Sequence, residues 1–167
     1  GEKLLTSNPS EGVTTLEHIY LQYSEYVNTL LRNLLLESYI KMDKYSSALR
    51  IIKDWENQSV ESEDDRKALI DAEIMWGDYN YKRGDKTSAS EAYKTAIMLA
   101  TKEQETIDGK KYPISWAKLQ FANILIEELN YDEGLRILEE ISNTTNPYSE
   151  LAKVRLKQAN LEKILTR

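Results

Sequence analysis

The sequence predicts a single all-α domain, and three observations support that fold class. Gly and Pro are scarce, at 6 and 3 of 167 residues, which favours long helices over a loop-rich or all-β fold. Apolar residues recur at steps of three and four, and no segment shows the sustained alternation of a half-buried strand. Trp76-Gly77 and Ala89 place small residues on two successive amphipathic segments, as expected where two helices lie close together.

Composition and charge exclude several classes of function. The formal net charge is −6 and no cluster of Lys and Arg stands out, so nucleic-acid binding is not expected. The chain has no Cys and one histidine, His18, so we expect no disulfide, metal site, cofactor or enzyme activity. No apolar run is long enough to insert into a membrane. Because the chain begins with Gly1, we expect an excised piece, and its cellular location is not predicted.

The first helix is expected after a short polar lead-in. Residues 1–13 are predicted to be flexible, and 14–167 to form one helical repeat domain. The segment Thr14-Thr15-Leu16-Glu17 resembles a capping box, so the helix is expected to begin there. Its apolar pattern continues to Leu36 with neither Gly nor Pro before Asp43, and we favour one long helix over two shorter ones.

Cap and turn signals separate the remaining predicted helices. Ser62 is a suitable N-cap, and the acidic residues after it favour the positive end of the helix dipole. Asn146-Pro147 is a strong start signal for the last helix, with Asn as the N-cap and Pro at the first helical position. The expected spans are 45–55, 62–83, 86–103, 114–129, 131–142 and 146 to near the end of the chain.

One spacing recurs three times along these helices. On each second helix a small residue is followed by a large apolar residue four positions later and by another apolar residue three further on. A tight position also lies twelve residues before each small residue, so the two can face each other across a close crossing of antiparallel helices. The small residues are Ala48, Ala89 and Gly134, and the tight positions are Leu36, Gly77 and Ala122.

This pattern resembles the tetratricopeptide repeat (TPR) family, whose repeat is a helix–turn–helix of about 34 residues. Trp76-Gly77 stands where the family has Leu-Gly, and Ala89-x3-Tyr93 stands where it has Ala-x3-Phe. The middle repeat departs from the family at Glu73, Asn80 and Thr101, where Trp, Tyr and Pro are expected. The resemblance covers about residues 29–147, and it implies a right-handed α-solenoid of about three TPR-like repeats plus a C-terminal capping helix.

The last helix is predicted to be this cap. Leu151, Val154, Leu161 and Leu165 lie on one side, and charged residues lie elsewhere. A terminal repeat must cover the core of its neighbour and present a polar face to water, so the apolar side is expected to face inward.

The resemblance also implies a function, because TPR arrays bind a peptide or helix of a partner protein in a concave groove lined by their first helices. Residues that flank the tight position on those helices are therefore groove candidates, and the alternative is that they are solvated residues of amphipathic helices. The candidates are Asn33, Glu37, Lys41, Ile74, Asp78, Lys82, Leu119, Asn123 and Glu127.

These positions also limit the kind of ligand. Chaperone-binding TPR proteins hold a C-terminal carboxylate with Lys, Asn and Arg, whereas here Glu37, Asp78 and Glu127 stand beside only Lys41 and Lys82. An acidic ligand with a free carboxylate end is therefore disfavoured. A helix, or a less acidic segment, suits a groove of mixed charge with apolar patches.

Two alternatives remain open. The chain is either such an adaptor or scaffold, or a structural segment of a larger helical assembly that contacts its neighbours through its ends or convex face. The first helix is in addition a candidate surface for a homo-oligomer, because Tyr20, Tyr23 and Tyr26 lie three residues apart on it. The other interpretation of these rings is that they pack as an end cap.

Overall fold

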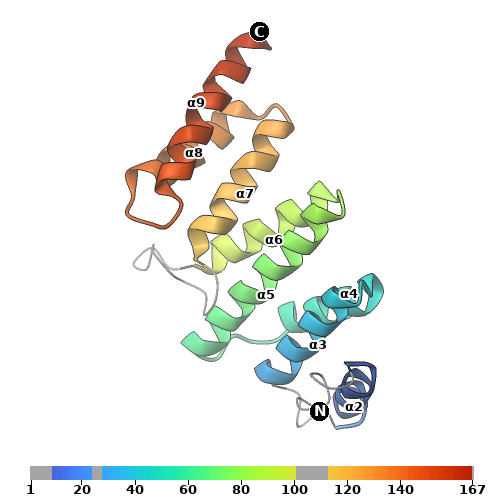
Figure 1. The fold of residues 1–167 in the computed structure, drawn as a ribbon. Coiled ribbons are helices and arrows are strands. Elements are labelled where there is room, and N and C mark those ends of the chain that lie inside the picture. The colour runs from blue at the N-terminus through green and yellow to red at the C-terminus, as the bar shows by residue number, and fades with distance from the viewer. Residues whose placement is uncertain (1–8, 24–27, 101–112, 167) are drawn as a thin grey trace.

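The computed structural model describes residues 9–23, 28–100 and 113–166. Over these ranges the protein contains eight helices and no strand (Figure 1), which confirms the all-α fold class. The helices are α2 (Pro9–Gln22), α3 (Thr29–Lys41), α4 (Tyr45–Glu56), α5 (Glu63–Lys82), α6 (Lys86–Leu99), α7 (Ile114–Glu127), α8 (Tyr131–Asn143) and α9 (Ser149–Leu165).

The prediction of one long first helix is wrong, because α2 ends at Gln22 and α3 begins only at Thr29. The residue before α3, Asn28, has an extended backbone with φ −137° and ψ 178°. Its side-chain oxygen accepts a hydrogen bond from the N–H of Leu31 at 3.0 Å. Such a cap satisfies a donor of the first turn and starts a new helix without any Gly or Pro.

The start of α2 also differs from the prediction. The segment Pro9–Val13, which was expected to belong to the lead-in, is helical, and Pro is favoured in the first turn of a helix. Thr14 does not cap the helix, because its hydroxyl donates to the carbonyl of Ser10 at 2.9 Å within the helix. Val13 and Leu16 are buried in the core, and this burial holds the extra turn in place. The remaining lead-in residues, 1–8, lie outside the described residues.

From Asp43 onward the predicted helices are confirmed, with small differences at their ends. Ser62 caps α5 as predicted, accepting from the N–H of Asp65 at 3.1 Å. The helix α6 ends at Leu99, short of the expected end at 103. Asn146 accepts from the N–H of Tyr148 at 2.9 Å, so it forms a turn in front of α9 rather than its cap.

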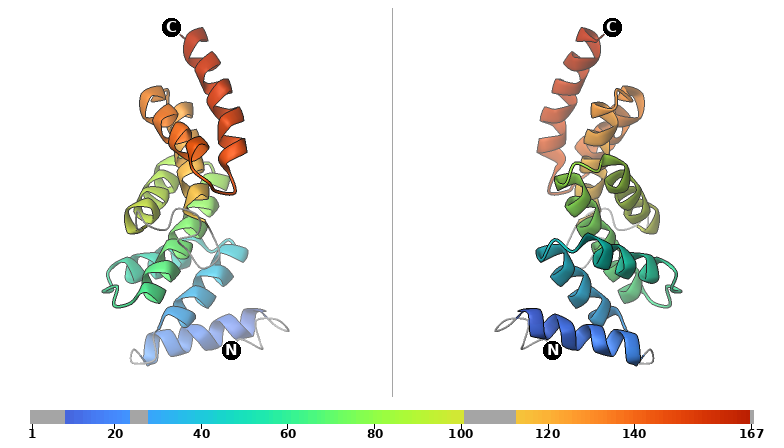
Figure 2. Two further views of the ribbon diagram at one scale, coloured as in Figure 1. Left: turned by 90° about the vertical axis from the view of Figure 1, so that its left-hand side faces the viewer. Right: turned by 90° about the vertical axis from the view of Figure 1, so that its right-hand side faces the viewer.

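The helices pack mainly on their neighbours in the sequence, and the array runs from α2 at one end to α9 at the other (Figures 1 and 2). Short turns join α5 to α6 and α7 to α8 in antiparallel pairs. The helix α3 packs on α4 and also contacts α5. The buried side chains accordingly form three clusters that follow one another along the array.

The predicted tight positions and the small residues that pair with them are all buried, and two of these six residues, Gly77 and Gly134, are glycines that a larger residue could not replace without movement. A Cβ at Gly77 would lie 2.7 Å from Cε1 of Tyr93. A Cβ at Gly134 would lie 3.2 Å from the carbonyl oxygen of Ala122, which confirms the close approach predicted for that pair of positions. At Gly77 the nearest atoms belong to the Tyr93 ring and not to the backbone of the facing helix, so the contact of α5 with α6 differs from that of α7 with α8.

The tyrosines of the first predicted helix do not form one stripe. The Tyr20 hydroxyl donates to the carboxylate of Asp54 on α4, and its ring packs against the core. Tyr23 is exposed at the end of α2 and meets the ring of His18 edge-on. Tyr26 lies outside the described residues.

The prediction that α9 presents its apolar side inward is wrong. Leu151, Val154, Leu161 and Leu165 are between 51% and 83% exposed. The helix instead packs on α8 through its opposite side, which carries the fully buried Ala152 and Ala159 and the half-buried Leu156. Two alanines seven residues apart let the helices approach closely, and the large apolar side chains are left facing away.

Candidate functional site

A hollow of about 670 Å³ lies between the C-terminal ends of α3 and α5. It brings together three of the predicted groove residues, Lys41, Asp78 and Lys82. Apolar atoms of Ile40 and Met75 form part of its wall. The other residues that line it are Asp43, Tyr79 and Arg83.

The free charge in this hollow is positive. Lys41 and Lys82 are exposed, and neither ammonium group pairs with a carboxylate in the part of the chain that the structure describes. The carboxylate of Asp43 instead accepts a hydrogen bond from the Tyr79 hydroxyl at 2.6 Å. The Arg83 guanidinium lies over the Tyr79 ring, 5.3 Å from its centroid. A ligand would therefore meet two unpaired ammonium groups beside an apolar wall.

Asp78 belongs to the frame of the site, because its carboxylate is already hydrogen-bonded. It accepts from the Tyr93 hydroxyl at 2.5 Å and from Nε1 of Trp116 at 3.1 Å. These bonds join α5 to α6 and to α7. Burial raises the pKa of Asp78 above its ordinary value, while the two donated hydrogen bonds act in the opposite direction.

Replacing Asp78 with Ala is expected to lower the free energy of unfolding by about 2–4 kcal/mol, because two donors lose their acceptor. Asp78→Asn keeps one side-chain oxygen and is the matched variant, for which we expect a smaller loss. Urea unfolding followed by far-UV circular dichroism measures both. Equal stability of the Ala variant and the unsubstituted chain would contradict this structural role.

Ile74 and Leu119 were predicted to line the groove, and these two predictions are wrong. Ile74 is fully buried in the cluster that contains Tyr93 of α6, and Leu119 is buried against Leu138 of α8. Each residue lies on the face by which a first helix packs on its own second helix. A first helix in the middle of an array has two buried faces, and apolar periodicity alone does not distinguish them from a groove.

The other candidates lie apart from the hollow. Asn123 accepts from Nε of Arg155 on α9 at 3.0 Å. Glu127 accepts from the Tyr81 hydroxyl at 2.7 Å and forms an ion pair with Lys86 at 2.7 Å. Asn33 and Glu37 are half-buried on α3 and are not among the residues that line the hollow. The structure thus brings together Lys41, Asp78 and Lys82 and leaves these four elsewhere.

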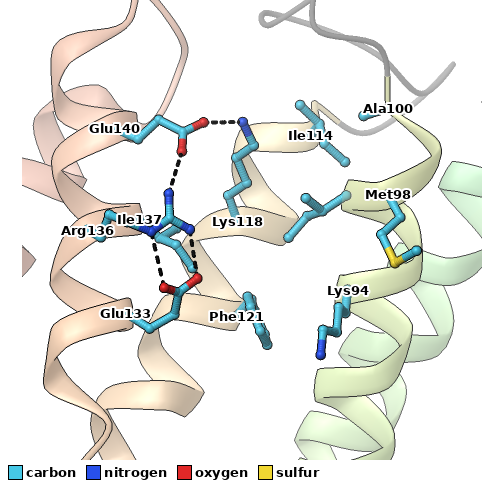
Figure 3. Close-up of a pocket in the computed structure, with 11 residues that line it drawn as sticks. Lys94, Met98, Ala100, Ile114, Lys118, Phe121, Glu133, Arg136, Ile137 and Glu140 are labelled. Carbon is cyan, nitrogen blue, oxygen red and sulfur yellow. Dashed lines mark hydrogen bonds and ion pairs between the residues drawn. The ribbon is translucent and has the colours of Figure 1, made fainter.

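A second hollow, of about 710 Å³, lies between α6, α7 and α8 (Figure 3) and was not predicted. Its apolar residues include Phe121 and the exposed Met98. Four of its five charged residues, all except Lys94, pair with one another: Lys118 and Arg136 contact Glu140 at 2.7 and 3.6 Å, and Arg136 also contacts Glu133 at 2.7 Å. Few polar groups are therefore free to recognise a ligand. Ile97 and Met98, adjacent apolar residues outside the repeated spacing of α6, are the sequence signal for this hollow.

Glu73 is the least expected buried group. It is fully buried on α5, and neither carboxyl oxygen has a hydrogen-bond partner among the described residues. Burial raises the pKa of Glu73 to about 10, and the neighbouring Glu56 acts in the same direction. The side chain is therefore a neutral carboxylic acid at pH 7. Over the described ranges no group of three side chains could hold a metal ion.

Comparison of the chain with protein-family models, curated proteins and solved structures finds no match. None of the described helices has both the length and the apolar character that crossing a bilayer requires. The likeness to the TPR family therefore stays a prediction that depends on the residues quoted for it.

Proposed function

We propose that this chain is a non-catalytic interaction module, a divergent TPR-like right-handed solenoid that binds a segment of a partner protein between α3 and α5. The observation that supports the proposal is that Lys41 and Lys82, which pair with no carboxylate among the described residues, lie beside the apolar Ile40 and Met75. Both lysines lie five residues after the tight position of their helices, Leu36 and Gly77. They therefore occupy equivalent places on adjacent first helices.

The chemistry of the hollow defines the segment that suits it. An apolar side chain can contact the wall, and one or two carboxylates can pair with the lysines. Asp78 and Asp43 already accept hydrogen bonds within the chain, so the ammonium groups of Lys41 and Lys82 are more available to a ligand than these carboxylates are. None of the groove candidates is an Arg, and the two asparagines among them, Asn33 and Asn123, do not line the hollow, so internal acidic side chains suit the hollow better than a free C-terminus.

The test is to select binding peptides from a random library on the whole chain. We expect the selected peptides to combine apolar residues with Asp or Glu. The double variant Lys41→Glu/Lys82→Glu should weaken their binding at least about tenfold, because attraction becomes repulsion. Isothermal titration calorimetry of synthesised peptides measures the affinities.

The matched control reverses two exposed lysines outside the hollow, as Lys94→Glu/Lys153→Glu. Lys94 lines the second hollow, so this control also tests that competing location. The control should leave the affinity within about twofold. The proposal is contradicted if no peptide is selected, or if the control weakens binding while the Lys41/Lys82 variant does not.

The alternative function, a structural segment of a larger helical assembly, is favoured by a different observation. The exposed apolar side of α9 lies at one end of the array, where no described helix covers it. A structural segment would contact its neighbours through such an end.

A further inference from the structure

The outer face of α9 has the spacing of a coiled-coil seam. Leu151, Val154, Leu161 and Leu165, with Gln158 between them, are separated by steps of three and four residues. These are the a and d positions of the heptad repeat, which line the contact between paired helices. The adjacent Ile164 is also exposed, so the apolar face is wider than the seam alone.

A comparison within the chain explains why no described helix covers this face. The sequence Ala-x-apolar occurs at the same place in three first helices: Ala72 and Ile74 in α5, Ala117 and Leu119 in α7, Ala152 and Val154 in α9. The alanine is fully buried against the preceding part of the array in each case. The apolar residue is buried by the following helix in α5 and α7, whereas Val154 is exposed.

The residue at the tight position of α9 is too large for a second helix to pack on it as α6 packs on α5. In this register Lys157 occupies the place of Gly77 and Ala122. Those small residues permit the close contact of α5 with α6 and of α7 with α8. The exposed Lys157 prevents such an approach, but it can lie at the edge of a helix pair with the wider spacing of a coiled coil.

We propose that two copies of this chain associate through the outer face of α9, as a short parallel pair of helices. Charge complementarity favours a second copy and this orientation. In a parallel pair, a residue at position g faces the residue five places later, at position e of the other helix. Glu150 would then face Arg155 of the second copy, and Lys157 would face Glu162 of the second copy.

One existing contact of α9 suits this pairing, and Glu150 would share its carboxylate between Lys153 of its own chain, now at 2.8 Å, and Arg155 of the second copy. Arg155 and Glu162 form an ion pair at 3.0 Å within one chain, so Glu150 and Lys157 of the second copy would extend it into a network. Lys157 has no partner among the described residues. An antiparallel pair centred on Gln158 would instead bring the two Lys157 ammonium groups together.

A short seam is sufficient because the helix is already formed. Two heptads are too short for an isolated coiled coil, whose helices must fold as they associate. Here α9 is held in place by α8 through Ala152 and Ala159, so association orders only surface side chains. We therefore expect a reversible dimer with a Kd of about 1–100 μM.

Sedimentation equilibrium of the whole chain over a range of concentrations tests the proposal. Leu161→Glu should abolish the dimer and leave helicity and melting temperature unchanged, because Leu161 is exposed in the single chain. The matched control is Leu21→Glu, which changes an equally exposed leucine on α2 and should leave the dimer intact. A chain that is monomeric at 500 μM (about five times the upper Kd) overturns the proposal, and so does a dimer that persists in Leu161→Glu.

Two further variants test the orientation. The chain has no Cys, so Leu151→Cys provides a single thiol that lies beside its counterpart only in a parallel pair. Oxidation should then cross-link most of the dimer, and an absence of cross-linking overturns the parallel arrangement. Lys157→Glu should weaken dimerisation about tenfold, and adding Glu162→Lys should restore it.

Discussion

Replacing Glu73 with Gln is expected to raise the free energy of unfolding at pH 7 by about 1–3 kcal/mol. Glu73 is fully buried and has a pKa of about 10 in the folded chain, compared with an ordinary value of 4.5. At neutral pH the folded chain must therefore hold a proton that the unfolded chain releases. Gln has the shape of the protonated acid and removes this requirement, so the folded state gains stability.

The direction of the pH dependence follows from the same difference. Between pH 4.5 and about 10 the folded state binds one more proton than the unfolded state. Stability is highest below this window and falls as the pH rises through it, by up to about 1.4 kcal/mol per pH unit. Between pH 5 and pH 7 the unsubstituted chain should lose about 2–3 kcal/mol more than Glu73→Gln.

Urea unfolding at pH 5, 6, 7 and 8, followed by circular dichroism, measures this difference. Glu91→Gln is the matched control, because Glu91 is an exposed glutamate that lines, together with Glu73, a hollow of about 330 Å³ between α4, α5 and α6. It should retain the steep dependence on pH. If the curves of Glu73→Gln and the unsubstituted chain are parallel from pH 5 to pH 8, then Glu73 is not the protonated group.

Replacing Gly77 with Val is expected to destabilise the chain by about 3 kcal/mol or more. A Cβ at this position would lie 2.7, 2.9 and 3.0 Å from three atoms of the Tyr93 ring. The ring is fully buried, and its hydroxyl is bonded to Asp78, so it cannot rotate away without losing that bond. The two helices must then separate, and the core cluster between them loosens.

Lys94→Val on the facing helix α6 is the control, because it introduces the same β-branched residue at an exposed position. It should change stability by less than about 1 kcal/mol. Thermal and urea unfolding of both variants provide the measurement. A Gly77→Val chain as stable as the Lys94→Val chain would show that the close contact with Tyr93 is absent.

Local signals were sufficient to predict most of the helix limits. The Ser62 cap and the Arg83–Asp85 turn act within a few residues, so the limits of α5 and the start of α6 follow from the sequence. The break at Asn28 was missed because its cap is a single side chain inside a continuous apolar pattern. The side of α9 that faces inward was also missed, because Ala152 and Ala159 pack closely while larger residues give the stronger pattern.

The candidate site was predicted in part for a related reason. Lys41 and Lys82 were identified because they flank the tight position on adjacent first helices of the TPR-like pattern. The engagement of Asp78 by Tyr93 and Trp116 depends on residues 15 and 38 positions away, which no local pattern reveals. The isolation of the buried Glu73 is likewise a property of the packed core, and it was not predicted from the sequence.

The succession of three core clusters along the array has a mechanical consequence. A force that pulls α2 and α9 apart acts on the clusters in series, because neighbouring helices carry most of the contacts. The weakest junction would open first and lengthen the molecule while the remaining clusters stay folded. Under tension the protein would therefore unfold in steps, one core cluster after another, rather than in a single event.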